Sequence, residues 1–366
     1  MKPGVSRPKI KYAVQHDPFY AQLKAKIDSY LEASGESRYA GPRMWKKTAT
    51  IIVLFLFFGG LVYFANLTGA AFILVMALWM FTQFLMTIGI AHDAAHDCYT
   101  RGKRSNRAIM YLFDAIGISS EHWIENHIHA HHSSPNVPGM DSAIESFSLM
   151  RLHPKTRAYR IQRLQHLYMF GIYSVATLFQ VYLLEFVSIA QGLVGFDRSD
   201  TSGGRKALLF LVQKLAVLGY SLILPLWLLP NPASEVVLGW LFGHVLCGLA
   251  LGIIFMTTHL HQATEFLEPD PLGRIHDSFA RSVLRTTADV APNNRFYTWI
   301  SGGLNHHVAH HLFPTISQIH LPIMTKIVKE TAKEFGVPYY EYSFIHGIRS
   351  HLRLLKKLGA LPDAPG

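Results

Sequence analysis

Histidines grouped at one point of the C-terminal third are the residues with the clearest potential for chemistry. His306, His307, His310 and His311 occur within six residues, in the run Asn-His-His-Val-Ala-His-His-Leu-Phe-Pro. If this run is helical, His307, His310 and His311 occupy positions i, i+3 and i+4 and share one face. Neutral imidazole is a good ligand for iron, copper, nickel and zinc. The spacing therefore predicts one half of a metal site.

Two earlier histidine clusters can supply the other half. His92 and His96 stand four residues apart in His-Asp-Ala-Ala-His-Asp, and His127, His131 and His132 are spaced similarly in His-Ile-His-Ala-His-His. A single pair at this spacing is weak evidence, because such pairs are often structural or incidental. Three clusters with helical spacing in one chain are poorly explained as surface or helix-capping histidines. They predict that several helices converge on a metal centre.

The number of clustered histidines favours two metal ions. The clusters hold eight histidines at helical spacing, whereas a first-row metal accepts about four to six ligands. His259 and His261 follow an apolar run, and either could complete the site. Polar residues flank the clusters, and we interpret them either as groups that fix the imidazole tautomers or as surface side chains. These residues are Asp93, Asp97, Asn136, Asp141 and Glu145.

The composition indicates a membrane protein. Of the 366 residues, 50% are hydrophobic and 16% are charged, whereas soluble domains have about 25% charged residues. Cys98 and Cys247 are too few for a disulfide framework or a thiolate metal site. The formal charge of +10 suits an acidic protein partner or lipid headgroups, and nothing in the sequence points to a nucleic-acid partner.

Long uncharged runs predict two helical hairpins in the membrane. The first stretch divides at a polar break into spans 48–65 and 70–90. Two further runs, 208–229 and 236–258, flank a proline-containing turn. Each run is long enough to cross a hydrocarbon layer of about 30 Å as a helix.

Residues 167–190 form another apolar run, which we expect to lie at the membrane surface. Gln180 and Glu185 interrupt it, and aromatic residues are spread along it. If this run also crossed the membrane, residues 307–311 would lie on the opposite side from the two earlier clusters. We therefore predict an all-α integral membrane protein with four transmembrane helices, arranged as two hairpins, and a helical cap that carries the three clusters.

Basic residues place the clusters in the cytoplasm. Lysines and arginines are frequent before the first span and after each of the first two clusters, which indicates the cytoplasmic side. Both termini are then cytoplasmic as well. We expect one domain over residues 1–366. Its parts are a cytoplasmic segment 1–47, a hairpin 48–90, a cytoplasmic region 91–206 with two clusters and the interfacial helix, a hairpin 207–258, and a cytoplasmic region 259–366 with the third cluster.

The three clusters, in this order and around two hairpins, resemble the histidine boxes of membrane fatty acid desaturases. The likeness covers residues 50–340 and extends to Trp123, Asn136, Gly139 and Asp141. The third box is especially similar to those of bacterial and front-end desaturases acting on lipid-linked or CoA-linked acyl chains. The resemblance implies a di-iron centre that uses O2 and two external electrons. Such a centre converts a methylene pair of a long fatty acyl chain to a double bond, with release of water.

Residue by residue, the resemblance implies nine iron ligands and no further catalytic residue. The ligands are His92, His96, His127, His131, His132, His259, His307, His310 and His311. Among them, His259 corresponds to an additional ligand that such enzymes use between the second and third boxes. His129 and His306 have no counterpart, and we expect them at the surface or around the ligands.

Two departures from the family pattern bear on the oxidised bond and on the electron source. His307 stands where front-end enzymes usually carry glutamine, and the His-Pro-Gly-Gly motif of a fused cytochrome b5 is missing from the sequence. We therefore expect electrons from a separate ferredoxin or cytochrome b5. The expected location is a bacterial inner membrane, or the endoplasmic reticulum in a eukaryotic cell.

Two other functions compete with desaturation. A hydroxylase on the same scaffold begins with the same removal of hydrogen, so only the product separates it from a desaturase. A non-catalytic zinc-binding membrane protein or a metal transporter is disfavoured. A transporter places ionisable ligands in mid-membrane. The clustered histidines are expected at the ends of the spans, and only His244 is expected deep within one.

Small residues suggest where an acyl chain would lie. Ala94 and Ala95 in the first box and the helix face formed by residues 243–256 are the candidates for lining an acyl tunnel. Under this hypothesis, replacing Gly248 or Gly252 by leucine shortens the accepted chain.

Overall fold

The computed structural model describes residues 10–141, 144, 149–190 and 203–360. Glu145, which follows the second box, lies outside these residues. The elements, with η for short π-helical or 3-10 segments, are β1 (Lys11–Tyr12), α1 (Pro18–Ser34), α2 (Pro42–Phe64), α3 (Gly69–Met86), η1 (Thr87–Ala91), α4 (His92–Ala95), α5 (Lys103–Met110), α6 (Leu112–Ala115), α7 (Ser120–Trp123), η2 (Ile124–His131), η4 (Arg160–Leu164), α8 (Gln165–Phe179), η5 (Gln180–Leu184), α9 (Glu185–Ala190), α10 (Gly203–Leu218), η6 (Gly219–Ile223), α11 (Leu224–Leu228), α12 (Ala233–His259), β2 (Arg274–Ile275), α13 (Phe279–Thr286), β3 (Asp289–Val290), α14 (Arg295–Ile300), α15 (His307–Leu312), η7 (Gln318–His320), α16 (Leu321–Glu334), β4 (Glu341–Tyr342) and α17 (Phe344–Ala360).

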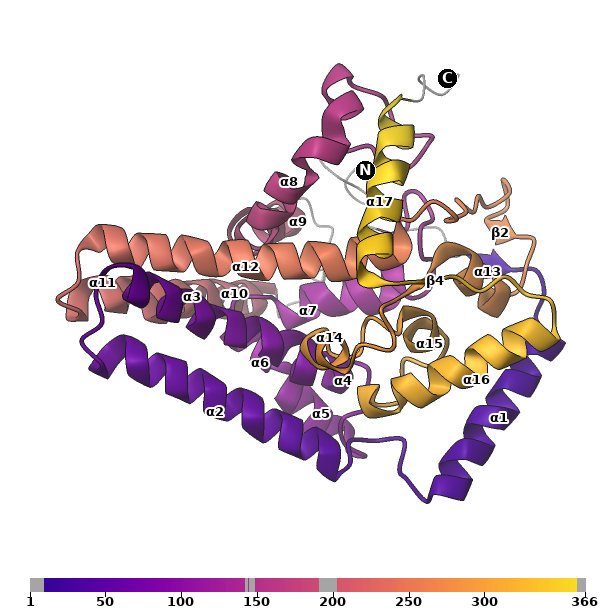
Figure 1. Cartoon of the computed structure of the whole chain (residues 1–366), viewed down its shortest axis with the longest axis horizontal. Coiled ribbons are helices and arrows are strands. Elements are labelled where there is room, and N and C mark those ends of the chain that lie inside the picture. The colour runs from indigo at the N-terminus through magenta and orange to yellow at the C-terminus, as the bar shows by residue number, and fades with distance from the viewer. Residues whose placement is uncertain (1–9, 142–143, 145–148, 191–202, 361–366) are drawn as a thin grey trace.

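The first uncharged stretch forms the hairpin of α2 and α3, as predicted (Figure 1). The chain reverses where Asn66 has a φ of 47° and Gly69 a φ of 61°, a left-handed conformation that these two residue types tolerate. The helix α2 begins at Pro42 rather than at residue 48, because proline is favourable in the first turn of a helix.

The helix α3 continues beyond the apolar stretch and delivers the first histidine box. It passes through the π-helical turn η1 into α4, so that one helix of 27 residues extends from Gly69 to Ala95. His92 begins α4 and His96 directly follows it. A π-turn inserts a residue into a helix and rotates the residues beyond it. The turn therefore contributes to the direction in which these imidazoles point.

The helix α12 lies in the middle of the bundle and contacts α3 and α8 through glycines (Figure 1). A Cβ atom on Gly243 would lie 2.5 Å from the sulfur of Met80 on α3. A Cβ atom on Gly248 would lie 2.3 Å from the carbonyl oxygen of Tyr173 on α8, and one on Gly252 would lie 2.4 Å from the Tyr173 ring. Glycines at this spacing allow helix backbones to approach closely. Our hypothesis that Gly248 and Gly252 line an acyl tunnel is therefore wrong, because both face α8.

Replacing Gly248 by alanine is expected to destabilise the protein by about 1–3 kcal/mol, the usual effect of overpacking a close contact. The new methyl group would collide with the backbone of α8, which cannot move aside as a flexible side chain can. A Cβ atom on Gly60 of α2 meets nothing within 4 Å, so Gly60→Ala is the matched control. The apparent unfolding temperature of each variant is measured in detergent. Equal unfolding temperatures for Gly248→Ala and Gly60→Ala would contradict this packing.

Five helices of the described residues are long and apolar enough to cross a membrane. They are Pro42–Phe64, Gly69–Ala95, Arg160–Ile189, Lys206–Leu228 and Ala233–His259. Four of them match the four predicted spans, two of which end one residue beyond their helices. The other, Arg160–Ile189, covers all but the last residue of the run 167–190 that we expected at the membrane surface. Its α8 segment crosses α12 steeply, whereas α2 and α3 run along the bundle (Figure 1).

The cap covers one end of the bundle and holds the third histidine box (Figure 1). Here α1 contacts α16, and α16 contacts α15. Two parallel strand pairs join distant segments, β1 with β2 and β3 with β4. The apolar core of this region includes Phe19, Leu23 and Ile27 of α1, Val308 and Leu312 of α15, and Met324 and Val328 of α16. The N-terminal segment thus packs directly against the helix that carries the third box.

Candidate metal centre

All nine histidines predicted as ligands meet where the cap joins the bundle. They come from the end of the α3–α4 helix, from η2, from the last residue of α12 and from α15. Each of the nine is at most 8% exposed. Burying this many imidazoles is costly unless their nitrogens find partners.

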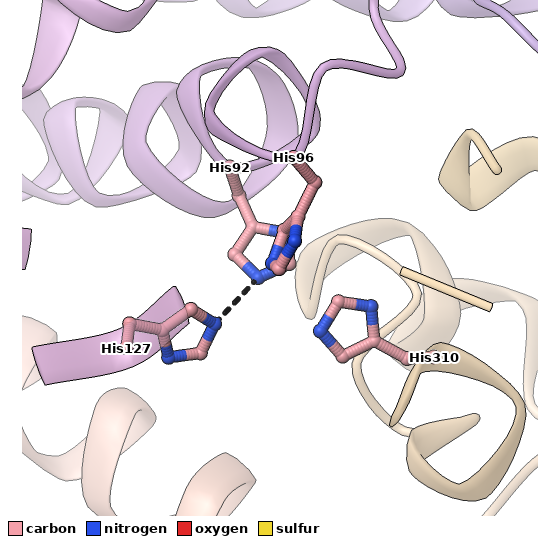
Figure 2. A group of neighbouring side chains, drawn as sticks. All are labelled: His92, His96, His127 and His310. Carbon is pink, nitrogen blue, oxygen red and sulfur yellow. Dashed lines mark hydrogen bonds between the residues drawn. The ribbon is translucent and has the colours of Figure 1, made fainter. Parts of the chain in front are cut away.

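The first histidine group consists of His92, His96, His127 and His310. One ring nitrogen from each lies within 4.8 Å of the others. Figure 2 shows the four rings approaching one another from three separate parts of the chain. His132 adjoins this group, because its Nε2 is 3.2 Å from Nε2 of His127 and 3.1 Å from Nε2 of His310.

The second histidine group consists of His131, His259, His307 and His311, again with ring nitrogens within 4.8 Å of one another. Nε2 of His307 lies 2.6 Å from Nε2 of His259 and 3.2 Å from Nε2 of His311. His259 thus joins the site from outside the three boxes, and His261 belongs to neither group. The rings of His132 and His311 stack at 4.3 Å, so the two groups adjoin.

Helix geometry divides each of the last two boxes between the two groups. Successive residues on a helix point about 100° apart, so His310 and His311 serve different groups. In η2 the backbone bond runs from His132 N to His127 O, a π-helical i+5 contact. His127 and His132 therefore lie together while His131 turns to the other group. The three rings still face the same centre, with centroids 4.7–5.7 Å apart, although they are divided between the two groups.

The donor geometry fits bound metal. Two nitrogens at right angles on one metal, each about 2.1 Å from it, lie about 3 Å apart. Nε2 of His92 is 3.2 Å from Nε2 of His127, which matches that separation. Buried polar atoms normally have partners, yet Nε2 of His96 and Nε2 of His131 have no hydrogen-bond partner. One such nitrogen belongs to each group, and a metal ion would satisfy it.

Burial keeps His96, His132, His307 and His310 in the neutral form that binds metal. It lowers the pKa of His96 and of His307 to about 3. Burial, with the neighbouring histidines as a smaller cause, also lowers the pKa of His132 and of His310 well below the usual value. At neutral pH each ring therefore keeps a lone pair for a ligand.

Two hydrogen bonds fix ring tautomers in the second group. Nδ1 of His131 lies 3.0 Å from Oδ2 of Asp141, which can only accept when ionised. Nδ1 of His307 lies 3.0 Å from the carbonyl oxygen of Leu304. Each ring donates from Nδ1 and leaves Nε2 free to bind metal. The interpretation of Asp141 as a residue that fixes a tautomer is thus confirmed.

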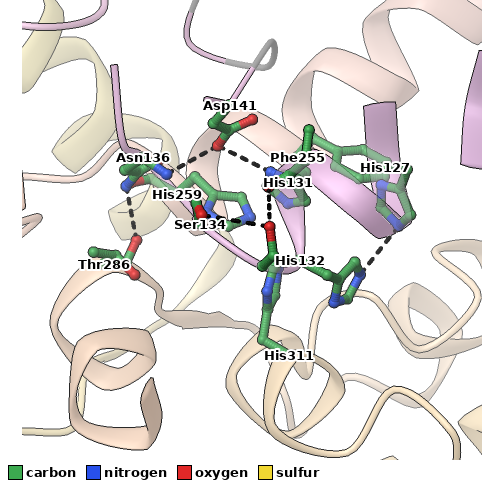
Figure 3. Close-up of polar contacts among 12 residues, drawn as sticks. His127, His131, His132, Ser134, Asn136, Asp141, Phe255, His259, Thr286 and His311 are labelled. Carbon is green, nitrogen blue, oxygen red and sulfur yellow. Dashed lines mark hydrogen bonds and ion pairs between the residues drawn. The ribbon is translucent and has the colours of Figure 1, made fainter. Parts of the chain in front are cut away.

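The loop after the second box is tied to the end of α12, as Figure 3 shows. The backbone N–H of Asn136 donates to Oδ2 of Asp141 at 2.9 Å. Its side-chain amide donates to the carbonyl oxygens of His259 and Thr286, each at 3.0 Å. Asn136 has a φ of 60°, a conformation that asparagine tolerates better than most residues. This one residue therefore links the segments that carry His131 and His259.

The two aspartates of the first box differ in role. Asp93 is 3% exposed and accepts hydrogen bonds from Ser317 Oγ and from the backbone and side-chain nitrogens of Gln318, at 2.8–3.0 Å. It ties the first box to the segment after the third box, so neither of our interpretations of Asp93 is correct. Asp97 is exposed, as the surface interpretation expects.

The remaining histidines lie apart from the two groups. His129 is exposed, whereas His306 is buried and its ring nitrogens lie 3.3 Å and 3.0 Å from the hydroxyls of Thr298 and Thr325. His244 contacts Thr177 within the bundle, with Nδ1 3.1 Å from the hydroxyl oxygen.

Sequence reasoning missed two residues beside the site. The ring of Phe255 lies 6.0 Å from that of His127 and 6.1 Å from that of His307. Its position four residues before His259 on α12 is the signal that could have identified it. Oδ1 of Asp289 accepts from the backbone N–H of Val308 at 2.9 Å at the start of α15. No spacing of residues along the sequence near Asp289 predicts that contact.

Comparison with known proteins identifies the family. A family model for fatty acid desaturases matches residues 66–343, an interval that contains all nine histidines. The chain belongs to the fatty acid desaturase family. It is therefore a membrane-associated oxidoreductase of lipid metabolism, and the predicted resemblance is confirmed.

Individual desaturases match along nearly the whole chain. The sn-1 linoleoyl-lipid 6-desaturase of Synechocystis is 34% identical over 364 residues, which cover 96% of this chain and 98% of that protein. The enzyme of the same name from Arthrospira platensis is 30% identical and covers 94% of both chains. An acyl-lipid (8-3)-desaturase of Physcomitrium patens is 28% identical over 96% of this chain and 74% of its own length.

Proposed function

We propose that this desaturase uses two iron ions to insert a carbon–carbon double bond into a long fatty acyl chain that is linked to a membrane lipid. The observation that supports it best is the pair of adjoining, buried, all-histidine groups. We assign the first iron to His92, His96, His127, His132 and His310, and the second to His131, His259, His307 and His311.

The names of the relatives favour a lipid-linked substrate over a CoA thioester. The proteins from Synechocystis and Arthrospira platensis are named for action on linoleoyl lipid, and the one from Physcomitrium patens for action on acyl lipid. A chain that matches all three over most of its length is expected to accept the same class of substrate. We therefore use linoleoyl lipid as the first substrate to test.

Bound iron would supply the oxygen activation that removal of hydrogen from an unactivated methylene requires. The protein's own contribution is to hold and shield the site. Asp141 and the Leu304 carbonyl keep protons on Nδ1 of His131 and His307, so that both Nε2 atoms can bind. The rings of Trp123 and Phe255 pack beside His127 and limit access of water. A dry site suppresses side reactions of an oxidising intermediate.

The proposed membrane topology has four spans, with both termini and the histidine groups in the cytoplasm. The nine histidines adjoin one another, and the labelled elements α4, α7 and α15 lie together beside the bundle (Figure 1). Four spans are consistent with that arrangement. In this topology, helix Arg160–Ile189 lies along the surface, which agrees with the steep crossing of α8 over α12. Electrons would come from a separate ferredoxin or cytochrome b5.

The test is product analysis in a bacterium that makes no polyunsaturated lipids. The cells express this chain with a ferredoxin or cytochrome b5 and receive linoleate, and gas chromatography–mass spectrometry locates any new double bond. His311→Ala is expected to abolish the product, whereas His129→Ala, in an exposed residue of the second box, is expected to retain it. A hydroxylated product in place of an alkene would replace the proposal with a hydroxylase.

A further inference from the structure

A buried ion pair lies between two of the apolar helices. Glu185 at the start of α9 is 0% exposed, Lys214 of α10 is 5% exposed, and Nζ of Lys214 is 2.6 Å from Oε2 of Glu185. Both residues belong to helices apolar enough to cross a membrane. Removing two charges from water is expensive, and the attraction between them compensates only when further hydrogen bonds satisfy both groups. The partners of this pair are therefore informative.

Apart from the side-chain amide of Gln180, which donates to Oε1 of Glu185 at 3.4 Å, those partners are backbone groups of the turn that precedes the second histidine box. The ammonium group of Lys214 donates to the carbonyl oxygen of Gly117. The backbone N–H of Ser119 donates to both carboxylate oxygens of Glu185, at 3.1 Å and 3.3 Å. Hydrogen bonds to charged groups are roughly twice as strong as those between neutral groups. The pair thus binds one acceptor of the turn, the carbonyl oxygen of Gly117, and one donor, the backbone N–H of Ser119.

The turn also fits closely between the two apolar helices. Gly117 has a φ of 93°, and a Cβ atom there would lie 3.0 Å from Val181 and 3.2 Å from Val217. Val181 lies on η5 and Val217 on α10. The turn therefore has little freedom to shift, and only glycine suits its central position.

The turn continues directly into the helix that carries the second box. The side chain of Ser119 caps α7 by accepting from His122 N at 3.3 Å, and Oδ1 of Asp114 accepts from Ser120 N at 3.2 Å. The helix α7 passes into η2 without a break, up to His131. His127 stands eight residues after Ser119, about 12 Å along such a helix. A tilt at the capped end would therefore displace the imidazoles at the other.

We propose that Glu185 and Lys214 are positioning residues for desaturation, which set the orientation of the second histidine box by holding the turn at Gly117 and Ser119. The inference rests on the proposed function. Neither residue belongs to a histidine group. Metal sites work when their ligands are held within about 0.5 Å and 10–20° of the productive geometry, and a fixed helix start provides that constraint. The competing explanation is that the pair only stabilises the packing of α9 against α10.

The double variant Glu185→Gln/Lys214→Met separates the two explanations. It removes both charges, so no unpaired buried charge remains, and glutamine can still accept from Ser119 N. The carbonyl of Gly117, however, loses its donor. The single variants Glu185→Gln and Lys214→Met each leave one buried charge unpaired. Glu235→Gln, at the opposite end of α12 from the histidines, is the matched control for a carboxylate on an apolar helix.

Four measurements are made on purified full-length protein: unfolding temperature, iron per chain, hydrogen exchange of peptides covering residues 117–132, and kcat and KM for linoleoyl lipid. The single variants are expected to unfold at lower temperature. The double variant is expected to recover the unfolding temperature while exchange in 117–132 stays faster and kcat stays about 10–100-fold lower, the range for groups that orient metal ligands. The KM is expected to remain within twofold of the unmodified value.

Recovery of kcat and of slow exchange together with stability in the double variant would overturn the positioning role. Unchanged exchange in residues 117–132 in all three variants would overturn it as well. Failure of the proposed function is a separate result. In that case the unmodified protein itself would bind no iron or form no alkene, whereas the exchange experiment would still report on the turn.

Discussion

Replacing His259 by alanine is expected to remove one of the two proposed irons per chain and to abolish alkene formation, although His259 lies outside the three histidine boxes. Its Nε2 is 2.6 Å from that of His307, and it is one of only four histidines in the second group. Losing one of so few ligands lowers metal affinity strongly, and the remaining iron cannot perform a reaction that needs both. Iron analysis of purified protein and product analysis in cells measure the two effects.

His261→Ala is the matched control for this prediction. His261 stands two residues further along the chain and is equally buried, but its Nδ1 is 3.5 Å from the hydroxyl of Tyr342 and it belongs to neither group. The variant is expected to keep both irons and to form product. Two irons per chain in His259→Ala would contradict the assignment of His259 as a ligand.

Replacing Asp141 by alanine is expected to lower iron affinity and activity by about 10–100-fold, the usual effect of removing a group that orients a metal ligand. Oδ2 of Asp141 accepts from Nδ1 of His131 and from the backbone N–H of Asn136, at 3.0 Å and 2.9 Å. Alanine would leave both donors buried without an acceptor and would free the His131 ring to rotate. Iron titration of the metal-free protein and kcat measure the loss.

Asp141→Asn tests whether the acceptor oxygen or the negative charge matters more. The donors on His131 and Asn136 use the same oxygen of Asp141, so the amide oxygen of asparagine can replace it. We expect Asp141→Asn to lose less than Asp141→Ala. Asp97→Asn, at an exposed carboxylate of the first box, is expected to change neither the iron affinity nor kcat. Equal iron affinity in Asp141→Ala and the unmodified protein would show that His131 needs no orienting partner.

Features that depend on neighbours along the chain were predictable. Apolar runs determine where long helices form, because a helix satisfies its own backbone groups in an apolar environment. The turn at Asn66 and Gly69 was predicted from local polarity and observed there. The three boxes indicated two metals from the number of imidazoles alone, and two histidine groups are present. His259 was included among the predicted ligands because of the resemblance to desaturases, and it lies within the second group.

Features that depend on the exact rotation of a helix were not predictable. The i+5 contact in η2 brings His132 beside His127 and sends His131 to the other group. A shift of one residue rotates a side chain by about 100°, so counting along the sequence cannot assign each imidazole to a metal. The prediction that Gly248 and Gly252 line an acyl tunnel failed for a related reason, because the helix face that they occupy contacts α8.

The sequence by itself determined that this is a helical membrane protein with three histidine boxes of the desaturase type, because apolar length and ligand spacing are local properties. Only the tertiary structure decided which nitrogens converge, that Asp141 and not Asp93 orients an imidazole, and that Glu185 and Lys214 hold the start of the second box. These contacts join residues far apart in the chain. Their geometry follows from how whole helices pack, and no local pattern encodes it.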